Sequence, residues 1–590
     1  MKRLATIVTA LAFSLATFAQ TYMRDIGNVN YTERLHDAII FGTGSSATSL
    51  VVGVTNQDGF DRVMLNKLDA NDGSLFYQKK YNIAYTTAKE RTVITSVKLA
   101  HDPASSSTTC MIAGSYTRTT ISGSPLGYGL FSLTFDENTG NILSIKRWES
   151  SVGSVTSMNV ASVCAGPGNN FYITGNIKYA NPELYIYVMA LNSGNNLIWN
   201  RIDHDVPTLT GSFNVADIVY SPYTPSGVNE IVIAGYWNPY AHGNPSNVFV
   251  RRFNAGTGAL IAQNLIGTGD NEVHLVASIV PSTSSAGIHD GFLICGTRED
   301  NTATQCAWVI KTNTTVSAVT WSKSYKYNVA GSQFKGTDIA EAIYTGSDPY
   351  SFYMIGTATN GISGATSDAA AIKIDANGSV IWFTSFTPSL HTTNKNEEAV
   401  VVIAHDHITN GLNLYGNRSN PSNPSQMDMY SVRLADEWAG AGTYYTCEQT
   451  TETPYTVSNV NLSVSAFTTQ DYAVLNSQSL LQTVTTISDN TFVCYESMLT
   501  GGRLASENDS EITTSFSLFP NPSAGHFILT NSSGRPATVS IYDVSGRPVA
   551  EPVQVTTTSL EFDLSNVQAG VYLVHVSYGE GEKVLRFIKE

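Results

Sequence analysis

Short apolar strands separated by polar turns run along most of the chain, and one of these strands recurs at a fixed interval. It is a run of three mostly apolar residues that ends in glycine, and the seven glycines are Gly53, Gly114, Gly175, Gly235, Gly296, Gly356 and Gly416. Successive glycines are 61, 61, 60, 61, 60 and 60 residues apart. A constant period of this length is the signature of a repeat architecture. We therefore expect seven equivalent structural units.

Each period contains four segments with the pattern of a β-strand. An apolar strand such as residues 37–41 precedes the glycine strand, a half-polar strand such as residues 248–253 follows it, and the fourth strand carries an aromatic residue such as Trp321. The first two strands are the most apolar, which is typical of strands buried between neighbouring units. One such unit cannot bury both faces alone, whereas seven in a circle can. The sequence predicts an all-β protein in which residues 20–448 form a seven-bladed β-propeller. A linear β-solenoid is the alternative, and it is disfavoured because its coils are usually shorter than these repeats.

The repeated glycine has a structural explanation. Without a Cβ, glycine permits positive φ or the close approach of a neighbouring backbone. How the ring closes is left open by the sequence: residues 22–26 or residues 443–447 could supply the last strand of the seventh unit.

The period is lost after residue 448, and three further regions follow. Residues 449–499 keep strand-like alternation and predict a β-rich cap or extension, or a small separate β module. Residues 500–514 are rich in Gly, Ser and acidic residues, which indicates a linker. Residues 515–590 have the pattern of a compact all-β domain.

The N-terminus has the pattern of a secretory signal peptide over residues 1–19. Lys2 and Arg3 precede an apolar stretch, and small residues around Ala19 suit cleavage before Gln20. No later run is apolar for long enough to form a transmembrane segment. The net charge is −15, which disfavours nucleic-acid partners by repulsion.

The C-terminal region carries several ordered motifs. They are Phe-Pro-Asn-Pro ending at residue 522, Gly-His-Phe from residue 525, Ser-Ile-Tyr-Asp ending at residue 543, and Ala-Gly-Val-Tyr ending at residue 572. With these motifs the region resembles the type A C-terminal sorting domain of type IX (Por) secretion substrates. The matching positions are Pro520, Asn521, Pro522, Gly525, Tyr542, Asp543, Gly546, Gly570, Tyr572 and Lys583.

The resemblance implies a small Ig-like β-sandwich that serves as an export address. It implies that the Sec machinery and an outer-membrane translocon are partners, and that the protein is secreted or held at the cell surface. It implies no activity for the repeats.

The six cysteines permit up to three disulfides in an exported chain. Cys295 and Cys306 lie almost symmetrically about a loop, so a cross-hairpin disulfide is reasonable, and Cys447 and Cys494 could staple the segment after the last repeat. Cys110 and Cys164 lie in apolar strands, where buried free thiols are one interpretation. No cysteine pair has metal-ligand spacing, and we expect no metal.

Several acidic positions are candidates for ion binding or catalysis. Asp61, Asp368 and Asp428 each precede a third strand and would converge on one face of the ring, where they could raise one another's pKa or bind a cation. The turns at residues 69–73 and 136–140 resemble calcium loops but lack a bidentate acid, so tight hairpins explain them better. His101-Asp102 and His405-Asp406 occur at the same strand end in two repeats, which favours a structural turn over a catalytic centre. We expect no cofactor, with calcium as the alternative.

Aromatic side chains are the main candidates for ligand binding. The segments between the second and third strands vary most. The aromatic residues in these segments that we assign to binding are Tyr128, Tyr179, Tyr236, Trp237 and Tyr240. Exposed aromatics beside Asn and Asp suit stacking on sugars or gripping a peptide. The alternative is that they cover neighbouring loops.

Motifs of serine hydrolases, zinc peptidases and nucleotide-binding loops are absent from the sequence. The sequence therefore favours an exported, non-enzymatic module that binds a glycan or an extracellular protein, although it leaves catalysis open. A secreted carbohydrate-active hydrolase that uses acids in the propeller channel is one alternative. A structural surface or matrix protein is another.

Overall fold

The computed structural model describes the following residues: 21–26, 32–42, 46–57, 60–71, 73–83, 90–102, 107–150, 155–180, 184–205, 211–222, 227–239, 247–267, 273–284, 288–299, 305–326, 333–342, 351–359, 367–386, 397–405, 411–419, 427–435, 449–450, 456–459, 463–466, 469–471, 475–479, 483–487, 491–496, 516–519, 523–531, 537–543, 547–555, 559–578 and 581–589. The predicted signal peptide and linker lie outside these residues. The chain divides into two compact units, Met1–Met498 and Leu499–Glu590.

The described part of the first unit contains seven antiparallel sheets of five strands each, which we number in chain order. Sheet 1 contains β2 (Thr32–Phe41), β3 (Thr48–Gln57), β4 (Phe60–Asp69), β5 (Leu75–Asn82) and β34 (Thr483–Ile487). Sheet 2 contains β6 (Glu90–His101), β7 (Thr109–Thr120), β8 (Pro125–Asp136), β9 (Ile142–Ser150) and β33 (Leu475–Ser479). Sheet 3 contains β10 (Val155–Gly166), β11 (Asn170–Tyr179), β12 (Leu184–Leu191), β13 (Leu197–Asp205) and β32 (Thr469–Asp471).

The remaining four sheets have the same strand order. Sheet 4 contains β14 (Gly211–Ser221), β15 (Glu230–Pro239), β16 (Asn247–Asn254), β17 (Leu260–Gly267) and β31 (Ser463–Ala466). Sheet 5 contains β18 (Val273–Thr283), β19 (His289–Glu299), β20 (Gln305–Thr312), β21 (Val319–Lys326) and β30 (Thr456–Asn459). Sheet 6 contains β22 (Gln333–Ala342), β23 (Ser351–Thr359), β24 (Ser367–Asp375), β25 (Val380–Phe386) and β29 (Gln449–Thr450). Sheet 7 contains β26 (Glu397–His405), β27 (Gly411–Ser419), β28 (Met427–Ala435), β1 (Thr21–Ile26) and β35 (Thr491–Glu496).

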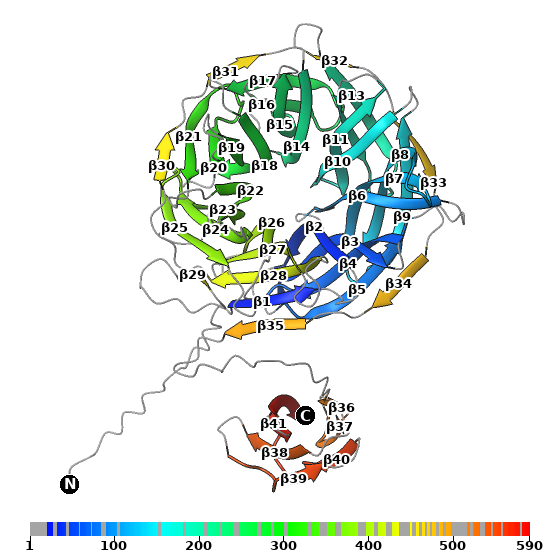
Figure 1. The fold of residues 1–590 in the computed structure, drawn as a ribbon, viewed down its shortest axis with the longest axis vertical. Helices are drawn as coiled ribbons and strands as arrows, with labels where there is room; N and C mark the ends of the chain where they lie inside the picture. The colour runs from blue at the N-terminus through cyan, green and yellow to red at the C-terminus, as the bar shows by residue number, and fades with distance from the viewer. Residues whose placement is uncertain are drawn as a thin grey trace, which may run out of the picture. The chain divides into compact units, whose positions relative to one another are not determined.

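The seven sheets follow one another around a ring, with their first strands nearest the centre (Figure 1). The first strands β2, β6, β10, β14, β18, β22 and β26 contact one another in this order, and β26 contacts β2 again. A cluster of buried hydrophobic side chains lies at each junction between described sheets. At the junction of sheets 7 and 1, for example, Tyr415 and Met429 pack with Val51 and Met64. The apolar faces that one sheet could not bury alone are therefore buried between neighbours.

The N-terminal strand β1 closes the ring. It pairs antiparallel with β28, so that Tyr22 lies opposite Arg433 and Ile26 opposite Met429. Of the two segments that the sequence left open, residues 22–26 supply the fourth strand of sheet 7, and residues 443–447 lie outside the described residues.

The strands after the last repeat form what we call the outer belt, defined as β29 to β35. Each belt strand pairs antiparallel with the outermost strand of one sheet, and the belt visits sheets 6, 5, 4, 3, 2, 1 and 7 in that order. Figure 1 shows these strands in yellow and orange along the outer edge of the ring. The described strands of residues 449–499, for which the sequence predicted a cap, an extension or a separate module, are thus shared among all seven sheets.

The repeated glycines sit where two backbones come close together. In each sheet the first strand has a bulge near the glycine, and a Cβ on Gly53, Gly175, Gly296 or Gly356 would collide with a carbonyl oxygen of that strand. In sheet 1 this oxygen belongs to Arg34. Close backbone approach, one of the two explanations expected from the sequence, therefore accounts for the period.

The second unit is a small all-β fold with two described sheets. One contains β36 (Phe516–Phe519), β37 (His526–Asn531) and β40 (Ser559–Asp563). The other contains β38 (Ala537–Asp543), β39 (Val553–Val555), β41 (Gly570–Tyr578) and β42 (Gly581–Lys589). Phe527, Phe562 and Phe587 pack in a common core with Val574 and Ile541. No α-helix is assigned in the described residues of either unit, and no helix in them could span a membrane.

Candidate functional site

Three aspartates lie on the first strands, near the axis of the ring. Asp37, Asp217 and Asp338 occupy the same register position, each paired with the residue that precedes the repeat glycine. The equivalent positions in the other sheets are Lys98, Ser162, Ser278 and Val401. We call these seven residues the axial positions. Because the first strands surround the axis, the register brings these residues to one level of the ring.

Each axial aspartate ties two neighbouring sheets together. Asp338 accepts a hydrogen bond from its own strand, Ile339 N to Oδ1 at 2.9 Å, and one from the next sheet, Val402 N to Oδ2 at 2.9 Å. Asp217 accepts in the same way from Ile218 N and Ile279 N, both at 2.8 Å. These backbone N–H groups lie on the free inner edges of the sheets and would otherwise lack a strand partner. The carboxylates therefore join the inner edges.

The axial carboxyl groups also influence one another. Burial raises the pKa of Asp338 to about 7, and the charge of Asp217 adds to this effect. Burial likewise raises the pKa of Asp37 and that of Asp217, while the Lys98 ammonium opposes both shifts. The Ser278 hydroxyl donates to Asp217 Oδ2 at 3.0 Å, and its interaction with Asp338 opposes the rise in the pKa of that carboxyl group. A serine of sheet 5 therefore interacts with carboxyl groups of sheets 4 and 6.

The three acids proposed from the sequence do not form this group. Asp61 accepts from Asn56 Nδ2 at 2.6 Å and from Ile94 N of sheet 2 at 3.0 Å, so it too joins two sheets. Asp428 is buried at 5% exposure. Asp368 lies in β24, and its side chain is outside the described part of the structure. The sequence analysis missed Asp37, Asp217 and Asp338, which lie in or beside the predicted first strands but 16, 18 and 18 residues before the repeat glycine, so no fixed spacing marks them.

The turns considered as calcium loops are tight hairpins that contact the preceding sheet. Gly140 has a φ of +65°, and its carbonyl accepts from the Tyr81 hydroxyl of sheet 1 at 2.6 Å. In sheet 6, Ala376 O accepts from Trp321 Nε1 and Gly378 O from the Tyr325 hydroxyl, both at 2.9 Å. Trp321, the fourth-strand aromatic residue noted in the sequence, therefore hydrogen-bonds the turn of the next sheet.

The aromatic candidates that the structure describes lie in strands, and their rings pack between sheets. Tyr179 ends β11, is only 7% exposed and packs edge-to-face on Tyr185, so the expectation that it is exposed is wrong. Tyr236 and Trp237 lie in β15 and pack against the clusters on either face of sheet 4. Tyr128 lies in β8 and packs against the cluster between sheets 2 and 3. Tyr240 is outside the described residues. The strands extend further into the variable segments than the sequence predicted, which places these rings between sheets.

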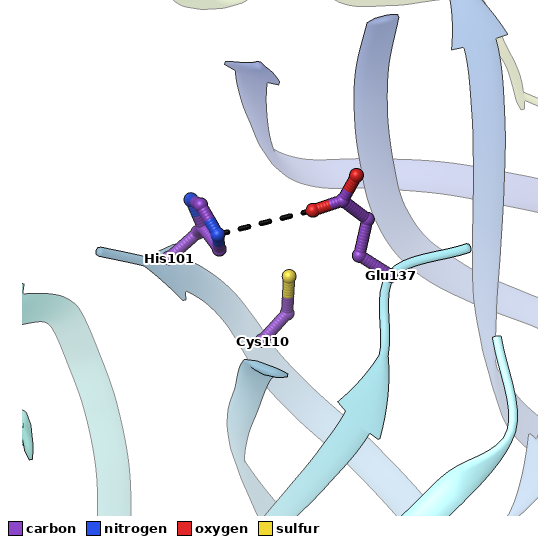
Figure 2. Close-up of side chains that lie close together, drawn as sticks. All are labelled: His101, Cys110 and Glu137. Carbon is purple, nitrogen blue, oxygen red and sulfur yellow. Dashed lines mark ion pairs between the residues drawn. The ribbon is translucent and has the colours of Figure 1, made fainter. Parts of the chain in front are cut away.

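A second polar cluster lies between sheets 1 and 2. The sequence analysis did not predict that its members would lie together. His101, the last residue of β6, is the cross-strand partner of Cys110 in β7, and Glu137 follows directly after β8. One ligand atom from each side chain lies within 4.8 Å of the other two, as Figure 2 shows. His101 Nε2 is 3.8 Å from Glu137 Oε2, the pair joined by the dashed line.

Side chains of sheet 1 surround this cluster. The Lys67 ammonium lies 3.4 Å from Glu137 Oε1, and the Tyr77 hydroxyl donates to the backbone carbonyl of Glu137 at 2.7 Å. The Phe41 ring packs edge-on against the imidazole, 4.5 Å between centroids. Burial lowers the pKa of His101 and raises the pKa of Cys110. The imidazole and the thiol are therefore both neutral near pH 7.

The predicted disulfide between Cys295 and Cys306 is wrong. Cys295 and Cys306 are free, as are Cys110 and Cys164. Cys295 lies opposite Val309, whereas Cys306 lies opposite Arg298, three positions away along the strand. Side chains at an odd offset point to opposite faces of a sheet, so these two sulfurs cannot bond. Cys494 lies in β35 and Cys447 is outside the described residues, so their disulfide stays a prediction.

The described sorting-motif residues occupy turns and core positions of the second unit. Gly525 has a φ of +120°, and its carbonyl accepts from Leu564 N at 2.8 Å. Asp543 accepts from Arg547 Nε at 2.9 Å across a turn, and Tyr572 is buried at 6% exposure. Tyr542 lies in β38, Gly570 begins β41, and Lys583 lies in β42. Pro520, Asn521, Pro522 and Gly546 are outside the described residues.

Comparisons with known proteins identify the second unit. Residues 517–590 match the family model described as a secretion system C-terminal sorting domain. No curated protein matches the sequence. Among solved structures, the ectodomain of the parainfluenza virus 5 hemagglutinin-neuraminidase is similar at 9% identity with a TM-score of 0.30, over 59% of this chain and 81% of that chain. The sorting domain makes the protein a substrate of the type IX system, so it is secreted or attached at the outer-membrane surface.

Proposed function

We propose that this protein is an exported binding module in which a seven-bladed β-propeller is carried to the cell exterior by an Ig-like sorting domain. The closed order of seven sheets, with one apolar cluster at each junction, supports the propeller. The two small sheets around a common aromatic core support the Ig-like fold. A type IX translocon would recognise the second unit.

The observation that carries a binding role over a catalytic one is the use of the axial carboxylates. Asp37, Asp217 and Asp338 each accept backbone N–H groups from two sheets. Acceptors engaged in this way hold a scaffold together and have fewer lone pairs left for a substrate. A rigid ring with variable connections between its second and third strands is suited to recognition.

The β7–β8 hairpin is the best described candidate for the contact surface. Both strands are 12 residues long, more than any other second or third strand described in the ring, and Gly123 N closes the turn on Thr120 O at 2.9 Å. Ile121 at this tip is 57% exposed and Leu126 is 46% exposed. Exposed apolar side chains grouped on one hairpin mark an interaction site more often than single ones do. The ligand class we propose is a glycan or an extracellular protein.

Binding screens test this proposal. The chain from residue 20 onward would be applied to glycan arrays and to arrays of extracellular proteins, beside an Ile121→Ser/Leu126→Ser variant. Loss of these side chains from a contact should weaken a real interaction at least tenfold, or by about 1.4 kcal/mol.

Ile288→Ser is the matched control. Ile288 is 66% exposed, but it lies between the first and second strands of sheet 5, at the opposite end of the strands. Binding that this control and the double variant lose equally would contradict the assignment of the surface. If the screens find no ligand, this result would favour a structural surface or matrix protein over a binding module.

One observation favours a hydrolase as the second candidate. A pKa of about 7 for Asp338, raised by burial and by the charge of the neighbouring Asp217, is typical of a general acid or base. Turnover of polysaccharides or chromogenic glycosides that Asp338→Asn abolishes, while Asp61→Asn preserves it, would support this candidate. Absence of turnover over a broad panel would count against it.

A further inference from the structure

The cluster of His101, Cys110 and Glu137 has a chemical composition that the scaffold does not require. Cys110 lies opposite Phe135 in β8, and Glu137 follows two residues after Phe135, with its N–H donating to Thr108 O at 2.8 Å. Because this bond continues the ladder, Glu137 lies on the same face of sheet 2 as Cys110. The imidazole, the thiol and the carboxylate therefore converge in the space between sheets 1 and 2.

The distances among these groups are close to those of a tetrahedral metal site. Zinc binds nitrogen, sulfur and oxygen donors at about 2.0–2.3 Å, which separates two donors by roughly 3.3–3.6 Å in a tetrahedron. The ligand atoms here lie within 4.8 Å of one another, and Nε2 and Oε2 are already 3.8 Å apart. Rotamer adjustments of about 1 Å would bring all three onto one ion.

The surroundings also suit a metal ion. The side chains of His101 and Glu137 are 9% and 17% exposed, and Cys110 is fully buried, so the site is largely sheltered from solvent. Tyr77 fixes the backbone of Glu137, and Phe41 fixes the imidazole plane. Lys67 contacts Oε1 of Glu137, which leaves Oε2 facing His101.

We propose that His101 Nε2, Cys110 Sγ and Glu137 Oε2 bind a divalent transition-metal ion of the zinc type, with water at the fourth position. Cys110 binds as the thiolate and releases its proton to solvent. The imidazole proton resides on Nδ1, which frees Nε2 for the ion, so that the present 3.3 Å contact between Nε2 and Ser107 O is given up. Mixed nitrogen, sulfur and oxygen donors select zinc or cobalt over calcium or magnesium.

The test uses the chain from residue 20 onward, free of affinity tags and stripped with a chelator. Cobalt(II) is added first, since a thiolate bound to it gives a charge-transfer absorption that buried thiols alone do not give. We expect saturation at one ion per chain and displacement of cobalt by zinc. Calorimetry with zinc should show a single site whose affinity falls at least a hundredfold in Cys110→Ser.

Cys295→Ser is the matched control, because Cys295 is also a buried free cysteine and lies in sheet 5. It should keep both the absorption and the zinc affinity. Glu137→Gln, which retains a hydrogen-bonding side chain, provides a second variant in case Cys110→Ser does not fold, and it should weaken zinc binding at least tenfold. Absence of a one-to-one cobalt spectrum in the unmodified chain would overturn the proposal, as would binding that Glu137→Gln leaves unchanged.

Discussion

At the scale of single residues, Asp338 shows how the ring shifts the properties of a side chain. It is held near the axis by two backbone N–H groups, and burial raises its pKa to about 7. The carboxyl group therefore binds its proton more tightly in the folded chain than in the unfolded chain, where the pKa is near 4. Its contribution to stability is fully present below about pH 4 and is lost as the pH rises through about 7.

We predict that Asp338→Asn makes the stability of the ring less dependent on pH. Relative to the unmodified protein, the variant should gain on the order of 2 kcal/mol in its free energy of unfolding between pH 4.5 and pH 7.5. Denaturant titrations at several pH values would measure this. Parallel stability curves for the two proteins would contradict the raised pKa.

Individual side chains were also where the sequence was least informative. Tyr179 and Cys295 illustrate the difficulty, because exposure and disulfide geometry depend on which face of a strand a residue occupies. A strand end misplaced by one residue reverses that face. The cluster of His101, Cys110 and Glu137 could not be seen either, since its members are joined by the register of three strands and carry no motif.

At the scale of elements, hairpin turns between third and fourth strands contact the preceding sheet, as in sheets 2 and 6. In sheet 6, Gly378 has a φ of +76°, and a Cβ there would lie 2.8 Å from both Lys323 Cγ and Trp321 Cζ3. The turn thus needs glycine for its backbone conformation and for the space that the indole occupies. The sequence predicted these turns correctly as tight hairpins, because the Asp-Asn-Gly pattern is local.

We predict that Gly378→Ala destabilises the protein by roughly 2–3 kcal/mol, from backbone strain and from the displaced indole together. Gly168→Ala is the control, because Gly168 has a φ of +72° and no atom lies within 4 Å of the place that a Cβ would take there. It should cost only about 1 kcal/mol. Chemical denaturation of both variants would measure the difference, and equal losses would show that the contact with Trp321 contributes nothing.

At the scale of the whole molecule, the repeat count and the sorting domain were predictable, because a period and a set of ordered motifs survive in the sequence. The strands of the outer belt were also expected, but the sheets with which they pair could not be predicted. They pair through backbone groups with seven different sheets, and backbone pairing leaves little trace in side-chain pattern. The closing strand β1 was one of two candidates for the same reason.

We predict that deletion of residues 449–497 leaves the ring folded but exposes an unpaired outer strand in every sheet. Such edges are sites of aggregation and proteolysis. The variant should keep its β-sheet circular dichroism, be cleaved by protease at least tenfold faster, and scatter more light on standing. Deletion of residues 500–514 is the control and should change none of these. A belt deletion that behaves like the control would mean that the outer pairing protects nothing.

The direction in which the belt travels has a mechanical consequence. The repeats advance from sheet 1 to sheet 7, and the belt returns through sheets 6, 5, 4, 3, 2 and 1 before it ends in sheet 7. Every boundary between neighbouring sheets is therefore spanned by two covalent passes of the polypeptide, wound in opposite senses. If a protease cleaves one of the two connections at a boundary, the other still joins the two sheets covalently. The ring would therefore stay closed after a single cleavage by an extracellular protease.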